Sequence, residues 1–352
     1  MLKSLVFKLG NLVGETGIYQ VLFPNRIPVF MLHRVTNGPT SLPGTLPAEK
    51  LRKHLEYLAA RRYQVLRMDE LLAALDTGQK FPQKAVLFTI DDGFKDHFEF
   101  AASIFDEFGF PLNFFVVTGL LDGRLWPWDD QITYAVNRTR VSEVEIPLPS
   151  GKLHQFDASS GSARQRARVL RNLLKDETQE RLYEWVRTDL YPRLKIEFPD
   201  EIPPEYRPMT WDDARSLQAR GHGIYPHTCT HRILSRLPPD EKQEEVTQSL
   251  RRVESELGTV PDAFAYPTGR PVDYDKSDIR ALQQSGFRMA FTTVPDYVRK
   301  GSTPYELPRF SLPENYAEYV RILNRLEVLY RLVSLQSRAT RAPGHAVSGQ
   351  AS

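Results

Sequence analysis

The sequence predicts an α/β fold built around a barrel of about seven mostly parallel strands. Short apolar runs rich in β-branched and aromatic residues alternate along the chain with segments of helical periodicity. The composition is also that of an ordinary globular protein, with 41% hydrophobic and 26% charged residues in a chain of 352. Such a chain can bury a core of the size that a barrel needs. Chemistry is then expected at the carboxyl ends of the strands.

The predicted strands and helices follow one another in regular order. Strands are short apolar runs bounded by turn residues, predicted over 27–32, 85–90, 113–118, 223–225, 263–266, 289–292 and 308–312. Helices show apolar residues three or four positions apart, predicted around 51–58 and 71–75 and over 95–108, 211–220, 239–257 and 277–285. A further amphipathic helix is expected over 316–333.

Residues 121–208 interrupt this alternation and are predicted to form an α-rich insertion on the barrel. The stretch contains a hairpin around 149–152 and a strongly charged helix from Ala163 to Leu190. Trp126 and Trp128 at its start could stack on a sugar ring or anchor the insertion. The predicted organisation is therefore an N-terminal amphipathic segment (1–26), a barrel with its insertion (27–312), a C-terminal helix (313–339) and a disordered tail (340–352).

The charge balance and the cysteine content exclude several classes of protein. With 46 Lys and Arg against 44 Asp and Glu, the formal charge is +2, so nucleic acid is not expected as a partner. The single cysteine, Cys229, cannot form a disulfide within the chain. Any metal ion must then be held mainly by histidine and carboxylate.

The N-terminal segment bears on location. Leucine and valine residues recur there at helical spacing, and the segment would either cover the open end of the barrel or lie on a membrane surface. It lacks the compact apolar stretch of a secretory signal, and no apolar run is long enough to span a membrane. The expected location is the cytoplasm, with peripheral contact at the inner membrane surface as an option.

Two adjacent carboxylates, Asp91 and Asp92, stand at the carboxyl end of an apolar strand and precede Gly93. Neighbouring residues point in different directions, so one carboxylate can bind a cation while the other faces the substrate as a base. Asp-Gly is also a common turn, so the pair alone does not establish a site.

Two histidines, His227 and His231, follow a later strand. On a helix such a pair lies on one face, close enough for both imidazoles to reach one divalent ion. Thr228 stands where the zincin motif has glutamate, which excludes that type of site. With Asp92 the histidines would form a set of two histidines and one carboxylate with open positions for water, the ligand count of a catalytic zinc site. Other divalent ions remain possible for this ligand set.

A third segment, Phe264 to Gly269, is another strand end that turns sharply at Pro267. A rigid turn of this kind can present a backbone N–H to a developing oxyanion. It can equally be an ordinary loop between a strand and a helix.

These three segments resemble the first three motifs of the polysaccharide deacetylase family, also called the NodB-homology family or carbohydrate esterase family 4. The resemblance extends over residues 27–312, interrupted by the insertion, and implies a distorted (β/α)7-type barrel. It further implies Asp91 as the general base and a backbone contribution of Tyr266 to oxyanion binding. The implied ligands of one divalent metal ion, with zinc expected, are Asp92, His227 and His231.

Two family features are missing from their usual places. The late Leu-x-x-His motif is absent, but His33, within residues 30–35, resembles the Tyr-His-x-Val start of the circularly permuted branch that includes poly-N-acetylglucosamine deacetylases. His33 is therefore expected to be the general acid, unless it is a structural histidine at a strand end. The arginine that steers the base is expected at Arg309, or else at Arg270, because Tyr266 and Pro267 occupy its usual position.

The function implied by this resemblance is a metal-dependent hydrolase that removes N-acetyl groups from amino sugars of a polysaccharide or glycan precursor. The expected partner is an N-acetylated amino-sugar glycan. Alternatives are a deformylase or amidohydrolase acting on a lipid-linked sugar or a cyclic amide, and a non-catalytic carbohydrate-binding module. The complete set of paired aspartates and histidines favours an enzyme. The glycan, its linkage, the acyl group and the oligomeric state are not determined by the sequence.

Overall fold

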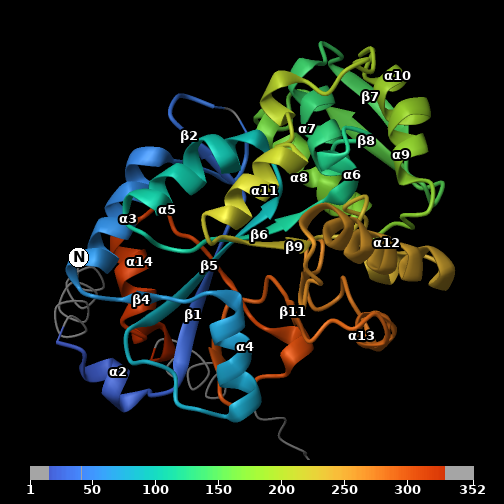
Figure 1. Ribbon diagram of the computed structural model, residues 1–352. Coiled ribbons are helices and arrows are strands. Elements are labelled where there is room, and N and C mark those ends of the chain that lie inside the picture. Colours follow the sequence, from blue (N-terminus) through green and yellow to red (C-terminus); the bar gives the residue numbers. More distant parts are fainter. Residues whose placement is uncertain (1–15, 41, 330–352) are drawn as a thin grey trace, which may run out of the picture.

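A mostly parallel sheet forms the centre of the molecule in the computed structural model, which describes residues 16–40 and 42–329 (Figure 1). Its strands are β1 (Arg26–Leu32), β4 (Gln64–Val65), β5 (Ala85–Asp92), β6 (Asn113–Val116), β9 (Gly223–Pro226), β12 (Tyr297–Arg299) and β13 (Phe310–Ser311). The order is β12-β1-β5-β6-β9, with β13 also on β1 and β4 on β5. Strand β12 is antiparallel to β1, whereas the other ladders are parallel.

Two more strands, β10 (Ala263–Ala265) and β11 (Met289–Phe291), form a separate parallel pair. A single parallel bridge joins Phe291 to Leu307, just before β13. Among the described residues no ladder joins β10 to β9, where instead the His227 imidazole contacts the Ala265 carbonyl at 2.7 Å. The predicted α/β class with parallel strands is confirmed, but closure into a barrel is not.

Side chains alternate between the two faces of the central strands. Phe30, Phe88 and Phe114 pack on one face against the helices that cover it. Val29, Leu87 and Phe115, one residue away in each strand, pack on the other face with residues of β10 and β11. Strand β5 is buried along its whole length, as expected for a parallel strand covered on both sides.

The predicted helices lie between the strands, and short helical segments that the sequence did not predict occur as well. They are α2 (Ile18–Leu22), α3 (Ala48–Ala60), α4 (Met68–Thr77), η1 (His97–Ala102), α5 (Ser103–Glu107), α6 (Thr118–Leu121), α11 (Trp211–Ala219), η4 (Leu234–Arg236), α12 (Pro239–Leu257), α13 (Lys276–Gln284), η5 (Pro304–Glu306) and α14 (Tyr316–Leu323). Short strands β2 (Arg34–Thr36) and β3 (Thr45–Pro47) follow β1. The helix predicted over 316–333 is interrupted at Arg325, whose φ is 62° and whose buried guanidinium donates to the carbonyls of Gln20 and Gln83.

The insertion forms a lobe of its own, drawn in green at the upper right of Figure 1. It contains α7 (Trp128–Arg138), β7 (Glu143–Pro147), β8 (Leu153–Asp157), α8 (Ala163–Leu174), α9 (Leu182–Trp185), η2 (Val186–Leu190), α10 (Tyr191–Arg193) and η3 (Pro204–Tyr206). Its hydrophobic cluster is distinct from that of the sheet and includes Trp128, which is fully buried. Trp126 is 3% exposed, so both tryptophans anchor the insertion and neither is placed to stack on a sugar.

The single helix predicted from Ala163 to Leu190 is wrong, because α8 ends at Leu174 and helical structure resumes at Leu182. The side chain of Gln179 donates to the Leu174 carbonyl at 3.0 Å and so satisfies one of the last acceptors of α8. The Glu177 carboxylate accepts from the backbone N–H of Ser150 at 2.8 Å. These contacts turn the chain, so that both helical pieces pack into one cluster.

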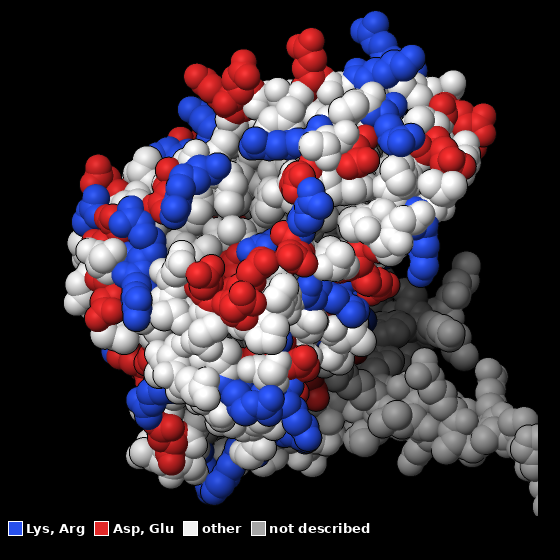
Figure 2. Space-filling model, turned by 90° about the vertical axis from the view of Figure 1, so that its right-hand side faces the viewer, with Lys and Arg blue, Asp and Glu red and all other residues white. Residues whose placement is uncertain are grey.

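The charge on the surface and the limited apolar length of the helices agree with what the sequence predicts. Acidic and basic side chains are interspersed over the face shown in Figure 2, in keeping with the small net charge. Within residues 16–40 and 42–329, no helix is both long and apolar enough to cross a membrane. Most of the predicted N-terminal amphipathic segment and the whole predicted tail lie outside the described residues.

Truncation of a core residue tests whether the insertion depends on its own core. Leu170 is fully buried in the insertion cluster, and Leu170→Ala is expected to lower the free energy of unfolding by about 2–5 kcal/mol. The neighbouring Val169 is 50% exposed on the same helix, so Val169→Ala is the matched control and should change stability little. Urea unfolding followed by tryptophan fluorescence measures both. Equal stability of the two variants would contradict the assignment of this core.

Candidate metal centre and active site

The two adjacent aspartates lie at the carboxyl end of β5, beside the ends of β6 and β9. Asp91 and Asp92 are both buried, with 2% and 8% exposure. Asp92 has a φ of 91°, a conformation that non-glycine residues seldom adopt. Its carbonyl accepts from the Val117 N–H at 3.0 Å, which fixes the turn that follows the strand. This backbone twist sends the two carboxylates to different partners.

The histidine pair lies on a tight loop after β9 and not on a helix, so the predicted helical face is wrong. Thr228 and His231 both have positive φ, 67° and 57°. The Thr228 hydroxyl accepts from the His231 N–H at 2.9 Å. These bends bring His231 back beside His227, with ring centroids 5.1 Å apart. The same proximity that a helix would give is reached by a different backbone path.

A buried carboxylate stabilises this loop by accepting hydrogen bonds from its backbone. Glu245 of α12 is 3% exposed and accepts from the N–H groups of Cys229 at 2.8 Å and Thr230 at 3.0 Å. Arg232 pairs with the same carboxylate at 3.0 Å. From the insertion, the Trp128 indole N–H donates to the His231 carbonyl at 3.0 Å. The loop is therefore fixed by contacts from two different parts of the chain.

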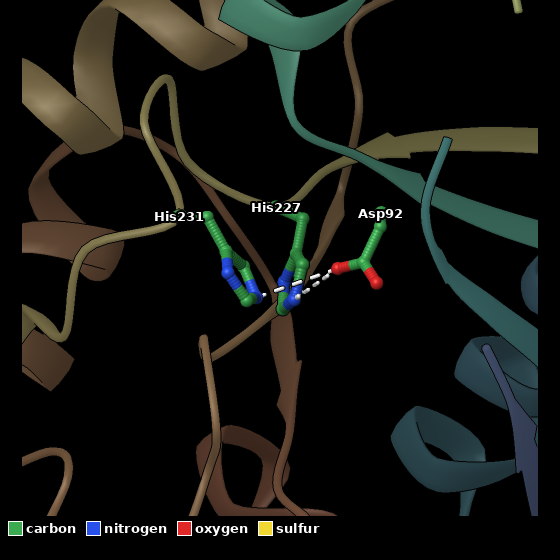
Figure 3. A group of neighbouring side chains, drawn as sticks. All are labelled: Asp92, His227 and His231. Atoms are coloured by element: carbon green, nitrogen blue, oxygen red, sulfur yellow. Dashed lines mark ion pairs between the residues drawn. The ribbon is translucent and has the colours of Figure 1, made fainter. Parts of the chain in front are cut away.

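Asp92, His227 and His231 converge on one point, as Figure 3 shows. The Asp92 Oδ1 atom lies 3.8 Å from His227 Nε2 and 3.4 Å from His231 Nε2. The three candidate ligand atoms lie within 4.8 Å of one another, and all three residues are buried. Asp92 Oδ1 has no hydrogen-bond partner among the described residues, although it is buried. A buried acceptor of this kind is costly unless something else occupies its lone pairs, and the donor set suits a divalent transition metal.

The second nitrogen of each imidazole also faces an acceptor, with a hydrogen bond for His227 and an ion-pair distance for His231. His227 Nδ1 lies 2.7 Å from the Ala265 carbonyl, so Nδ1 carries the proton and Nε2 presents its lone pair. His231 Nδ1 lies 3.3 Å from Oδ1 of Asp129, a residue of α7. A carbonyl and a carboxylate behind the imidazoles are the partners that orient metal-ligating histidines.

Burial and charge shift the pKa values of this set strongly when no metal is bound. Burial raises the pKa of Asp92 to about 7, although His231 opposes the rise. Burial likewise lowers the pKa of His227 to about 3. Burial would also lower the pKa of His231, but the carboxylates of Asp92 and Asp129 outweigh it and raise that pKa to about 9. Strongly perturbed groups around one point are typical of a functional site.

Asp91 has a different environment because it pairs with Arg309, a fully buried residue just before β13. The guanidinium donates to both carboxylate oxygens, each at 2.7 Å, and also to the Thr292 carbonyl at 3.0 Å. Burial would raise the pKa of Asp91, but the Arg309 charge outweighs it and holds that pKa below its usual range. Arg309 is thus the arginine beside the predicted base. Arg270, the other candidate, pairs with Asp273 at 2.8 Å.

His33 follows β1 and lines the same cavity as the two aspartates. Its carbonyl lies 2.6 Å from His97 Nε2, and the nearby Val35 N–H donates to the Asp96 carboxylate at 2.8 Å. Hydrogen bonds with the segment after β5 therefore fix the backbone of the segment after β1. Burial lowers the pKa of His33 to about 4, with partial opposition from Asp91, so the imidazole is neutral near pH 7.

The backbone N–H of Tyr266 is not free to bind an oxyanion, which differs from what the family resemblance implies. Its N–H donates to the Phe291 carbonyl at 3.1 Å, and its hydroxyl donates to the Tyr305 carbonyl at 3.1 Å. The N–H is therefore committed to the β10–β11 pair. Thr268, two residues on, also lines the cavity and has a φ of 56°. Its N–H has no acceptor among the described residues, which makes it the freer donor of this turn.

Sequence reasoning missed a group of residues from the start of the insertion. Asp129 lies behind His231, and Asp130 pairs with Arg34 at 2.8 Å. The signal was present as two acidic residues directly after Trp128, but acidic residues in the first turn of a helix are common. With the aspartates and histidines described above, these residues line an open cavity of about 350 Å³.

Comparison with known proteins agrees with this geometry. The sequence profile of the polysaccharide deacetylase family matches residues 78–290, more than half of the chain. The chain belongs to this family. Deacetylation of a glycan, by hydrolysis of a carbon–nitrogen bond, is accordingly its activity. The chain is 20% identical over 286 residues to the provisionally assigned polysaccharide deacetylase YxkH of Bacillus subtilis, covering 81% of this chain and 71% of YxkH.

Solved structures of similar fold include other deacetylases. The Streptococcus pyogenes deacetylase PplD, in complex with acetate, is 16% identical, with a TM-score of 0.56 over 84% of this chain and 97% of PplD. IcaB from Ammonifex degensii is 16% identical, with a TM-score of 0.56 over 85% of this chain and 97% of IcaB. A de-N-acetylase from Aggregatibacter actinomycetemcomitans gives 0.55 at 16% identity, over 85% of this chain and 100% of the other. At these identities the likeness shows the fold.

Substitution of Asp129 tests the arrangement behind the metal ligands. Asp129→Asn keeps the size of the side chain but removes the charge that faces His231 Nδ1. We expect zinc affinity to fall by about 10–100-fold, as for other partners of metal-bound histidines. Competition with a chelating dye measures the affinity. Asp200→Asn, at an exposed site of the same insertion, is the control. Unchanged affinity in Asp129→Asn would contradict the assignment.

Proposed function

We propose that this family member is a metal-dependent deacetylase that removes N-acetyl groups from amino sugars of a polysaccharide or glycan precursor. The observation that carries the metal dependence is the buried Asp92 oxygen without a hydrogen-bond partner, faced by Nε2 of both His227 and His231. These three residues would hold one divalent ion, with zinc proposed because the set matches catalytic zinc sites. When bound, the ion would supply Lewis-acid polarisation of the acyl group and of a water molecule.

Asp91 is the proposed general base. Its low pKa keeps the carboxylate ionised at neutral pH, so it can accept the proton of a water molecule that attacks the acyl carbon. Arg309 holds both carboxylate oxygens and therefore fixes the direction in which Asp91 faces the cavity. The arginine also prevents Asp91 from taking a proton before substrate binds.

His33 is the proposed group that protonates the departing amine. Because its imidazole is neutral near pH 7, it must first take up the proton that Asp91 has received from the attacking water, and then deliver it to the nitrogen as the carbon–nitrogen bond breaks. The negative charge of Asp91, which follows the paired position on the neighbouring strand β5, favours the protonated imidazole. For the oxyanion we propose the N–H of Thr268, since the N–H of Tyr266 would first have to release the Phe291 carbonyl.

Two further features of the chain remain proposals. We infer that β9 and β10 complete a distorted barrel, supported by the contact of His227 with Ala265 across the gap between them. We also propose a cytoplasmic location with peripheral contact at the inner membrane surface. Support comes from the apolar spacing near the N-terminus and from Ile18, Val21 and Leu22, which are 46%, 63% and 60% exposed.

The base is tested by Asp91→Asn. With the zinc-loaded protein and an N-acetylated glucosamine oligomer, we expect acetate release to fall by at least about 100-fold, the scale of a general base. Zinc content should remain, because Asp91 is not among the proposed ligands. Normal turnover by the variant would remove Asp91 from the mechanism. Wild-type protein that neither binds a divalent ion nor releases acetate would favour a carbohydrate-binding module instead.

The pH dependence tests the role of Arg309. In Arg309→Gln the positive charge is lost while burial remains, so the pKa of Asp91 should rise. The base is active only when ionised, so the acid limb of kcat/KM against pH should move to higher pH. Arg309→Lys keeps a charge and should move the limb less. Superimposable profiles for wild type and Arg309→Gln would rule out this electrostatic role.

A further inference from the structure

Some of the basic side chains that line the cavity form close ion pairs with carboxylates, and others do not. Arg34 pairs with Asp130 at 2.8 Å, and Arg270 pairs with Asp273 at 2.8 Å. Arg171 of α8 reaches Asp129 only at 3.9 Å, and its buried Nε has no hydrogen-bond partner among the described residues. Lys175, one helical turn on, lines the same cavity.

Lys175 has no carboxylate within ion-pair distance in the part of the chain that the structure describes. The residue is only partly exposed, and burial lowers the pKa of its ammonium group. A cation held partly away from water without a direct ion-pair partner is unfavourable. The carboxyl end of α8 offsets little of this, because the effect of a helix terminus on a nearby charge is small and Gln179 already satisfies the Leu174 carbonyl.

Asp129 and Asp273 attract the Lys175 ammonium group without forming an ion pair with it, and the acidic residues of the cavity lie closer to other groups. Asp91 is neutralised by Arg309 and Asp130 by Arg34. Asp129 faces His231 at 3.3 Å, and Asp92 faces both imidazoles of the proposed metal set. The wall formed by α8 therefore presents positive charge without a close partner to the cavity that also holds the groups proposed for hydrolysis.

We propose that Lys175 and Arg171 form an anion subsite, so that the acylated amino sugar carries an oxyanion, a phosphate or a carboxylate, next to the reacting amide. This inference rests on the proposed function and narrows its substrate class to acidic sugars. Lysine binds such groups as a compact charge, and arginine adds directed N–H donors. Both residues belong to the insertion, which thereby selects the substrate while β5 and the loop after β9 carry the chemistry.

Equilibrium binding to the zinc-loaded Asp91→Asn protein tests the subsite without turnover. The probes are N-acetylglucosamine 1-phosphate, N-acetylmuramic acid, which carries a carboxylate, and the neutral methyl glycoside of N-acetylglucosamine. We expect at least one acidic sugar to bind roughly tenfold more tightly than the neutral one, the scale of one charge-assisted contact. The acidic sugar with the larger advantage identifies phosphate or carboxylate as the source of the charge.

A second substitution decides whether Lys175 is responsible, because an acidic sugar could also approach the metal. When Lys175→Gln is added to the Asp91→Asn protein, most of the preference for the acidic sugar should be lost. When Lys175→Arg is added instead, most of the preference should be retained. Lys152→Gln, at an exposed position of the insertion outside the cavity, should leave it unchanged. Equal binding of all three probes, no binding of any, or a preference that survives Lys175→Gln would overturn the subsite. Acetate release by the wild type is a separate readout, so its failure would count against the proposed hydrolysis and not against the subsite.

Discussion

The site depends on one contrast, in which two adjacent carboxylates are held in different electrostatic environments. Asp91 receives both arms of the buried Arg309 guanidinium, which keeps it ionised. Asp92 receives no hydrogen bond on its buried Oδ1 and faces two imidazoles instead. One carboxylate can then accept a proton while the other acts as a ligand. Because Asp92 has a positive φ, its side chain and that of Asp91 point to different partners although the two residues are adjacent.

The second ligand segment needs support from outside the sheet. The loop that carries His227 and His231 has two residues with positive φ, a conformation that costs free energy unless the surroundings impose it. Glu245 supplies that restraint from α12, and Trp128 and Asp129 supply it from the insertion. The insertion is therefore part of the active-site structure and not merely an addition to the fold. It lines the cavity with residues at the start of α7 and at the end of α8.

Local sequence patterns were sufficient for the residues that are neighbours in the chain. Asp91 and Asp92 follow an apolar strand directly, so their place at its carboxyl end could be read from the pattern. The histidine pair was found for its spacing, although the helix that motivated it is absent. In contrast, whether the Tyr266 N–H is free to bind a substrate depends on whether a carbonyl of β11 lies close enough to accept a hydrogen bond from it. No property of the turn itself reveals that.

The sequence by itself determined the α/β class, most of the strands and helices outside the insertion and the identity of the paired aspartates and histidines, because hydrophobic periodicity and residue type are local properties. Tertiary structure alone decided which charges meet. Arg309 reaches Asp91 across 218 positions of sequence, and Asp129 reaches His231 from another lobe. Coulomb interactions and burial depend on distance in space, so pKa values, ligand geometry and the positive charge of Lys175 at the cavity arise only when the folded chain brings these groups together.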